Sequence, residues 1–175
     1  MVVAIGAEAD VVAPLDLPRD AQVQAVAALD AWSTTALRDA VVKTLERLAP
    51  EAGRQALIVF SDGTDRYSQA SDAEMLERAR RGGALVYPIV IGRASVPALS
   101  DVARLTGGRA FVLRDATGLD TALGTIAREL RHQYLLGYAP AATADAGRWH
   151  PIQVRVRGQQ ARGLRVRARD GYVAP

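Results

Sequence analysis

The side chains best suited to chemistry directly follow an apolar run. Ala56 to Phe60 is apolar without interruption, and Ser61-Asp62-Gly63-Thr64-Asp65 comes next. An apolar run without alternation predicts a strand covered on both faces, as in a parallel sheet. Ligands of such sheets gather at the carboxyl ends of strands, where these carboxylates and hydroxyls could hold a divalent cation. The same residue types also suit a plain turn that binds nothing.

Motifs for several other chemistries do not occur in the sequence. Because the chain has no cysteine, disulfides, thiolate zinc sites and cysteine nucleophiles are excluded. His132 and His150 have no second histidine at ligand spacing. There is no Gly-x-Ser-x-Gly elbow, no Gly-x-x-x-x-Gly-Lys loop and no Gly-x-Gly-x-x-Gly after a strand. We therefore expect a protein that is not an enzyme.

Length and composition indicate one globular domain with a basic tail. The chain has 175 residues, 49% of them hydrophobic, which is enough for a single core. The formal net charge is +3. From Arg131 onward the chain has eight arginines but only two acidic residues, Asp145 and Asp170. We do not infer a nucleic-acid partner from this charge. No apolar stretch approaches the roughly 20 residues of a spanning helix, so we expect no transmembrane segment.

Strand and helix patterns alternate through the first three quarters of the chain. The expected strands span residues 2–5, 10–13, 56–60, 84–92 and 110–113, and the first two form a hairpin. The expected helices span residues 20–29, 33 or 34 to 48, 72–81, 96–105 and 119–132. This alternation predicts an α/β, doubly wound and mostly parallel sheet with right-handed crossovers.

Local patterns predict details of these elements. Ser71 and Glu74 have capping-box spacing, and Pro88 requires a bulge or a local edge because it cannot donate to a ladder. Two helices carry a one-sided apolar pattern. Their expected inward residues are Val23, Val26, Ala27 and Leu29 in the first, and Leu37, Val41, Leu45 and Leu48 in the second.

Beyond Arg131 the pattern changes to the period of two that is typical of strands. We expect a strand over Tyr134–Tyr138, a loop over Ala139–Gly147, and then an antiparallel hairpin with alternating apolar residues and arginines. The domains are accordingly residues 1–132 and a β extension over residues 133–175. The arginine face could contact acidic protein, anionic glycans or phosphates, but base rates favour a solvated face.

The order of these pieces resembles the von Willebrand factor A family, specifically bacterial proteins with a von Willebrand factor A-related domain. Ser33 to Ala40 is similar to the family's Thr-Ala-Leu-x-Asp-Ala helix start, and Ser61 to Asp65 is similar to its Ser-Asp-Gly-x-Asp strand end. Tyr134–Tyr138, Arg148–Ile152 and the terminal Arg167–Pro175 resemble the segment that closes this bacterial subgroup. The resemblance covers most of the chain.

The resemblance implies a Rossmann-like sheet with a metal-ion-dependent adhesion site, which in this family binds Mg²⁺. The family's site combines an Asp-x-Ser-x-Ser loop, a threonine and an aspartate. Thr35 matches the threonine and Asp62 the aspartate, whereas Asp-x-Ser-x-Ser does not occur in the sequence. Since Mg²⁺ wants near-octahedral oxygen ligation, we expect these two residues to bind it weakly.

The resemblance also implies a function and a missing strand. The first central strand of the family would precede Met1, so we expect an N-terminally truncated domain in which residues 2–5 and 56–60 either pair directly or leave a gap. The implied function is noncatalytic binding of a protein partner at the carboxyl ends of the strands, with an extracytoplasmic location for the full-length parent. The alternative is a metal-independent assembly component that pairs through exposed sheet edges.

Overall fold

A parallel sheet of three strands lies at the centre of the α/β body. The structure is a computed structural model, and it describes residues 1–30, 35–92, 96–139, 147–158 and 163–174. The sheet has the order β3-β4-β5, formed by β3 (Ala56–Ser61), β4 (Leu85–Ile91) and β5 (Phe111–Leu113). Both ladders are parallel, which confirms the predicted α/β class.

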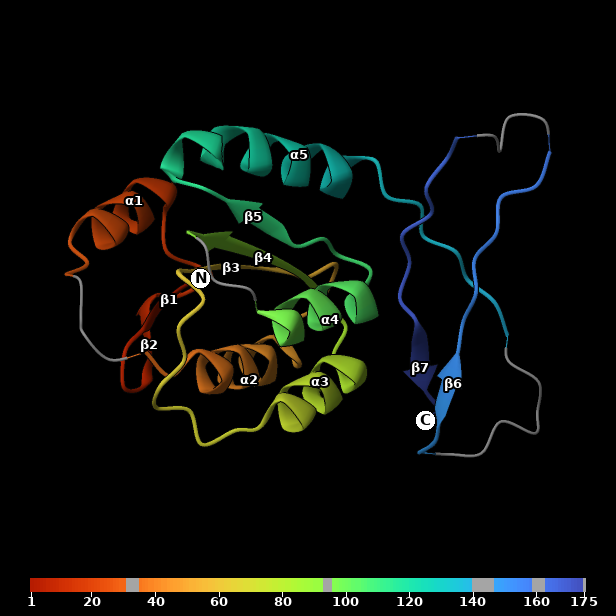
Figure 1. Ribbon diagram of the computed structural model, residues 1–175, viewed down its shortest axis with the longest axis horizontal. Coiled ribbons are helices and arrows are strands. Elements are labelled where there is room, and N and C mark those ends of the chain that lie inside the picture. The colour runs from red at the N-terminus through yellow and green to blue at the C-terminus, as the bar shows by residue number, and fades with distance from the viewer. Residues whose placement is uncertain (31–34, 93–95, 140–146, 159–162, 175) are drawn as a thin grey trace.

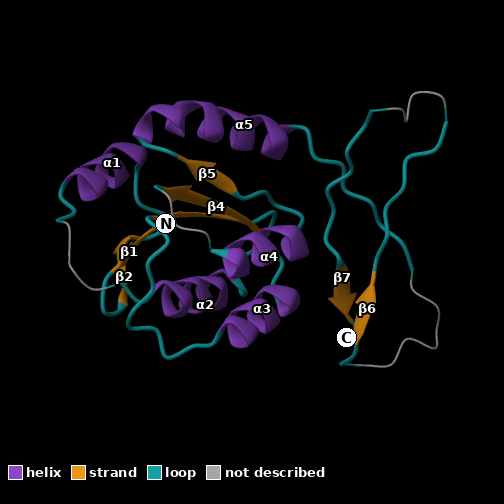
Figure 2. Cartoon of the chain, in the orientation of Figure 1, coloured by secondary structure: helices purple, strands orange, loops and turns teal. Residues whose placement is uncertain are grey.

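Helices cover both faces of this sheet, as Figures 1 and 2 show. On one face lie α2 (Leu37–Leu48), α3 (Asp72–Arg81) and α4 (Pro97–Thr106), and on the other lies α5 (Leu119–Arg131) after a short 3₁₀ turn, η1 (Ala116–Gly118). Val86 and Val90 of β4 belong to the core cluster with α2, α3 and α4. Tyr87 and Ile89 belong to the cluster with α5. Alternate residues of β4 therefore build the two halves of the core.

Pro88 stands in the central strand without disrupting it. The ladder between β4 and β5 begins only at Ile89 and Phe111, one residue beyond the proline. Before that point the Val86 N–H donates to the Thr106 hydroxyl at 3.0 Å rather than to a strand. Pro88 thus lies at a local edge of the ladder, as expected from its missing N–H.

The strand β3 is an edge strand whose two faces are both covered as expected, since Leu57 and Val59 pack in the core cluster on one face and Ile58 in the cluster on the other. Among the described strands it pairs only with β4, and Phe60 near its end is 46% exposed. The hairpin of β1 (Val2–Ile5) and β2 (Ala9–Ala13) forms a sheet of its own. In the described chain β1 and β3 share no ladder, although Ile5 and Val59 pack in the same core cluster. The direct pairing of residues 2–5 with 56–60 is therefore absent from the described chain.

Two helices test the amphipathic patterns with opposite results. All four predicted inward residues of α2 are buried, which confirms its apolar face. The helix begins at Leu37 rather than at Ser33 or Thr34, which lie outside the described residues. The first helix, α1 (Arg19–Ala27), buries none of its residues, and Val23 and Val26 are 59% and 50% exposed. The predicted inward face of α1 is therefore wrong, because no described element covers it.

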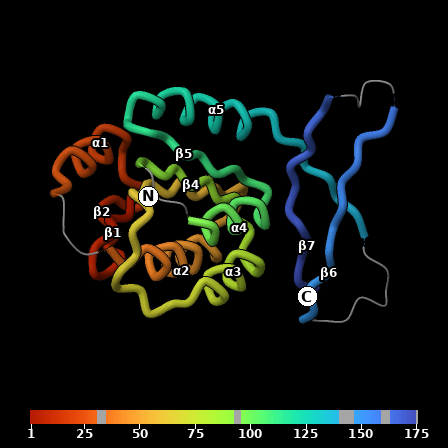
Figure 3. Tube along the Cα trace, in the orientation of Figure 1, coloured from red at the N-terminus to blue at the C-terminus, as the bar shows by residue number. Residues whose placement is uncertain are grey.

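The tail differs most from the sequence pattern. Among its described residues only β6 (Trp149–Pro151) and β7 (Gly171–Val173) pair, so the strand predicted over Tyr134–Tyr138 and the hairpin predicted over 152–157 and 164–169 are wrong. Figure 3 shows two extended arms that meet at β6 and β7. The arginine faces of the expected hairpin would have placed like charges opposite one another, which disfavours the ladder.

Contacts to the body provide the second reason for the open hairpin. Residues 164–170, here called the C-terminal arm, bind the α/β body instead of the other arm. Arg167 forms an ion pair with Glu129 of α5, and Arg169 donates to the carbonyl oxygens of Arg80 and Gly82 at 3.0 and 2.6 Å. Burial lowers the pKa of Arg169. Both arginines anchor the arm: Arg167 pairs with α5, and Arg169 satisfies carbonyls at the end of α3.

Candidate ligand face at the carboxyl ends of the strands

The turn after β3 is held in shape by its own side chains. The Ser61 hydroxyl accepts a hydrogen bond from Gly63 N–H at 2.9 Å. Asp62 Oδ1 accepts from the N–H and the hydroxyl of Thr64 at 2.9 and 2.6 Å. Gly63 has φ of 86°, a left-handed conformation that glycine adopts at no steric cost. The turn is therefore fixed without any ligand.

Asp62 combines a stable charge with an accessible oxygen. Hydrogen bonds from the Thr64 hydroxyl and N–H lower the pKa of Asp62, so the carboxylate stays ionised in mild acid. The residue is exposed. Both hydrogen bonds from Thr64 reach Oδ1, which leaves Oδ2 for a further contact. Asp62 can thus accept a hydrogen bond from a partner or contact a cation.

Thr35, the other predicted site residue, lies against the loop that carries Asp62. Its carbonyl oxygen accepts from Arg66 N–H at 3.1 Å and from Tyr67 N–H at 3.3 Å. These bonds join the segment before α2 to the loop after β3. The structure therefore brings Thr35 and Asp62 onto adjoining segments at the same end of the sheet.

The donor set at this end falls short of a complete magnesium site. Within the described ranges no group of three or more His, Asp or Glu side chains could hold a metal. Asp62 offers Oδ2 in addition to Oδ1, which is already bonded to Thr64, and Thr35 offers one hydroxyl. Since Mg²⁺ requires about six oxygen ligands in near-ideal geometry, these two residues do not fit a tightly bound ion.

Asp65, the second carboxylate of the turn, serves the fold instead. Its Oδ2 accepts from Arg38 N–H at 2.9 Å and from the Ser68 hydroxyl at 2.8 Å, and Arg38 Nε lies 3.1 Å away as an ion pair rather than a hydrogen bond. Burial acts to raise the pKa of Asp65, but the bonds from Arg38 and Ser68 outweigh it and lower the pKa overall. Asp65 thus caps α2 from a distant loop.

Hydrogen bonds in both directions between the first turn of α2 and the loop form what we call the α2 clamp, which consists of Arg38, Asp39, Asp65 and Ser68. The Ser68 hydroxyl accepts from the N–H groups of Arg38 and Asp39 at 3.0 and 3.2 Å. The Asp39 carboxylate accepts from the N–H groups of Gln69 and Ala70 at 3.0 and 2.8 Å. From the sequence, Asp65 and Ser68 are expected to steer the loop rather than to form a site, but Asp39 was not singled out. Its only signal was an acidic residue in a first helical turn.

A second Asp-x-Thr turn follows β5. Asp115 Oδ1 accepts from the N–H of Thr117 at 2.9 Å and also from its hydroxyl, and these bonds, the hydroxyl first, lower the pKa of Asp115. The arrangement repeats that of Asp62 and Thr64 after β3. Because the strands are parallel, both turns lie at the carboxyl edge of the sheet. The sequence analysis did not single out Asp115.

Comparison with known proteins supports the fold and leaves the function open. No family model matches the chain, and no curated protein matches it. The conserved hypothetical protein BatB from Bacteroides thetaiotaomicron is similar in structure, with a TM-score of 0.57 and 13% identity over 75% of this chain and 78% of that chain. An uncharacterized membrane spanning protein from Vibrio fischeri has a TM-score of 0.41 and 21% identity over 72% and 73%. The likeness to BatB supports a Rossmann-like fold of the von Willebrand factor A type.

The sequence also predicts that the chain has no transmembrane segment. In the described part of the chain, no helix is both long and apolar enough to cross a membrane, as expected from the sequence.

Proposed function

We propose that the protein is a noncatalytic binding module of von Willebrand factor A-like fold, which engages a protein partner at the carboxyl ends of β3 and β5. The observation that carries this proposal is the ionised Asp62 carboxylate, which keeps Oδ2 for a further contact in a turn already fixed by Thr64. A charged acceptor held in one geometry loses little entropy on binding. It suits a basic side chain or an N–H group of the partner.

The α2 clamp supports this assignment because it immobilises the loop around Asp62. Bonds from Arg38 to Asp65 and from Ala70 to Asp39 tie both ends of the loop to the first turn of α2. Thr35 adds two backbone bonds to the same loop. We propose that recognition depends on Asp62 itself, and that Mg²⁺ contributes weakly because Thr35 and Asp62 provide few of its ligands.

Capture of partners by matched variants tests the proposal. Immobilised wild-type protein, Asp62→Ala and Glu51→Ala are incubated with the same extract, and bound proteins are quantified by mass spectrometry. Glu51 is exposed beyond the end of α2 opposite to the clamp. We expect proteins that Glu51→Ala retains and Asp62→Ala loses at least about tenfold, the usual effect of losing one charged hydrogen bond. Equal capture by both variants would contradict the proposal.

A second candidate function rests on the open edge of β3. This strand pairs only with β4 in the described chain, and Phe60 is 46% exposed beside it. An unpaired edge can accept a strand from another chain, which is the assembly function. A Phe60→Asp variant would then lose capture or self-association, whereas Asp62→Ala would not.

A further inference from the structure

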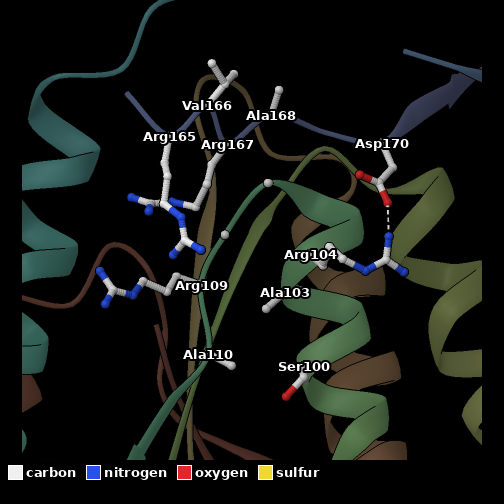
Figure 4. A pocket seen from close by; sticks show the side chains of 12 residues that line it. Ser100, Ala103, Arg104, Arg109, Ala110, Arg165, Val166, Arg167, Ala168 and Asp170 are labelled. Carbon is white, nitrogen blue, oxygen red and sulfur yellow. Dashed lines mark hydrogen bonds and ion pairs between the residues drawn. The ribbon is translucent and has the colours of Figure 1, made fainter. Parts of the chain in front are cut away.

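A cavity of about 450 Å³ opens between the C-terminal arm and the body. One wall is the end of α4 with the segment leading to β5, and the other is the arm at Arg165–Ala168 (Figure 4). This volume is within the usual range of small-molecule pockets, roughly 300–1,000 Å³. The cavity is distinct from the carboxyl face of the sheet and plays no part in the function proposed above.

Both walls are fixed in place by direct bonds. The N–H of Asp170 donates to the Leu105 carbonyl at 3.1 Å, and the Asp170 carboxylate pairs with Arg104. Gly107 has φ of 83°, and a Cβ there would lie 2.8 Å from the backbone of Ala168. The arm therefore packs on the glycine without room for a side chain. Such a contact sets how closely the arm approaches the end of α4.

Arginines from both walls line this cavity. Arg104 and Arg109 belong to the body, whereas Arg165 and Arg167 belong to the arm. In Figure 4 the side chains of Arg165 and Arg167 extend from the arm toward the side on which Arg109 lies. Guanidinium groups brought together from two segments repel one another unless anions lie between them.

The carboxylates nearby do not compensate all of this charge. Arg104 pairs with Asp170 and, at 3.5 Å, with Asp101. Arg109 and Arg167 share the single carboxylate of Glu129, the former at 3.6 Å. Arg165 has no ion-pair or hydrogen-bond partner in the part of the chain that the structure describes. Four arginines thus face three carboxylates, two of which belong to Arg104, and this leaves Arg165 unpaired among the described residues.

We propose that this cavity binds the phosphate group of a small soluble ligand. Guanidinium groups match phosphate oxygens in bidentate geometry. A tetrahedral phosphate presents acceptors in several directions, which suits donors on two opposing walls better than a planar carboxylate does. A bound dianion would neutralise Arg165 and relieve the shared pairing at Glu129. Arg165 and Arg167 are exposed, as expected for a solvated arginine face, whereas Arg169 is partly buried against the body.

Calorimetric titration of inorganic pyrophosphate tests the proposal at a constant ionic strength of about 0.15 M, where surface charges are screened over roughly 8 Å. We expect saturable binding by the full chain. Arg165→Gln and Arg109→Gln, one from each wall, should each weaken it at least about tenfold, the loss of one charged bond. Arg155→Gln is the matched control, since Arg155 bonds to Gln153 and does not line the cavity. It should bind within about twofold of wild type.

Three results would overturn this assignment. Absence of saturable heat would show that the cavity takes no phosphate. Equal weakening by Arg165→Gln and Arg155→Gln would show diffuse attraction to a basic tail. Unchanged affinity in either wall variant would exclude a site built from both walls. The partner-capture test is independent, because none of these arginines lies at the Asp62 turn.

Discussion

The N–H of Arg38 donates a hydrogen bond of 2.9 Å to Oδ2 of Asp65, 27 positions later in the chain. This bond joins the first turn of α2 to the loop after β3. The shape of the loop therefore depends on a helix that is distant in sequence. Asp62 lies at the start of this loop.

Removal of the Asp65 carboxylate should destabilise the fold. Asp65→Ala leaves the Arg38 N–H without its carboxylate acceptor and breaks the bond to Ser68. We expect the free energy of unfolding at neutral pH to fall by about 2–3 kcal/mol, as for bonds to a charged group. Urea denaturation measures it. Asp62→Ala, whose bonds lie in an exposed turn, should cost less than about 1 kcal/mol.

The contribution of Asp65 should also depend on pH. Its pKa is lowered in the folded protein, so its ionised form stabilises the fold fully above the unfolded pKa of about 3.9. This stabilisation is lost as the pH falls through the lower, folded pKa. The difference in unfolding free energy between wild type and Asp65→Ala should be constant from neutral pH to about pH 5 and shrink toward about pH 3. A difference that grows in acid would refute the assignment.

The capping box of α3 makes a local prediction. The Ser71 hydroxyl accepts from Glu74 N–H at 3.2 Å, while Glu74 accepts from Ser71 N–H at 2.7 Å. Ser71→Ala should lower the free energy of unfolding by about 1 kcal/mol. Ser100→Ala, at an exposed position within α4, should be neutral or slightly stabilising because alanine favours helix. Thermal unfolding of both variants provides the comparison.

Gly107 should control the docking of the C-terminal arm. Gly107→Ala adds a Cβ that clashes with Ala168 and strains a left-handed residue. Hydrogen exchange should then rise in residues 164–170, where the Asp170 N–H bonds to Leu105. Gly124→Ala in α5 meets nothing within 4 Å and should leave the arm protected. Equal exchange in the two variants would mean that the arm does not depend on this contact.

The sequence predicted what short-range patterns encode. The capping box, the buried face of α2 and the local edge at Pro88 each follow from neighbours a few positions apart. The tail and α1 could not be predicted in this way. Alternation in the tail indicates strands, but it cannot show that Arg167 and Arg169 find Glu129 and the α3 carbonyls rather than a hairpin partner.

The candidate site shows the same limit. Asp62 and Thr35 could be chosen from motifs, but the division of roles between Asp62 and Asp65 depends on α2 folding against the loop. Asp115 was missed because its equivalence to Asp62 arises only when β3 and β5 align in one parallel sheet. Likewise, the apolar run predicts that both faces of β3 are covered, but it cannot show which strands lie beside β3, and one edge is open in the described chain.

Carboxyl-directed footprinting of the wild-type protein, alone and with a partner obtained by capture, tests the central claim most directly. Reagent labelling of Asp62 reports on the surface at the carboxyl ends of the strands, whereas hydrogen exchange over Ala56–Phe60 reports on the open edge of β3. The account predicts that the partner protects Asp62 and leaves Glu51 labelled as before. Unchanged labelling of Asp62, with protection confined to residues 56–60, would contradict the Asp62 face and favour assembly through the strand edge.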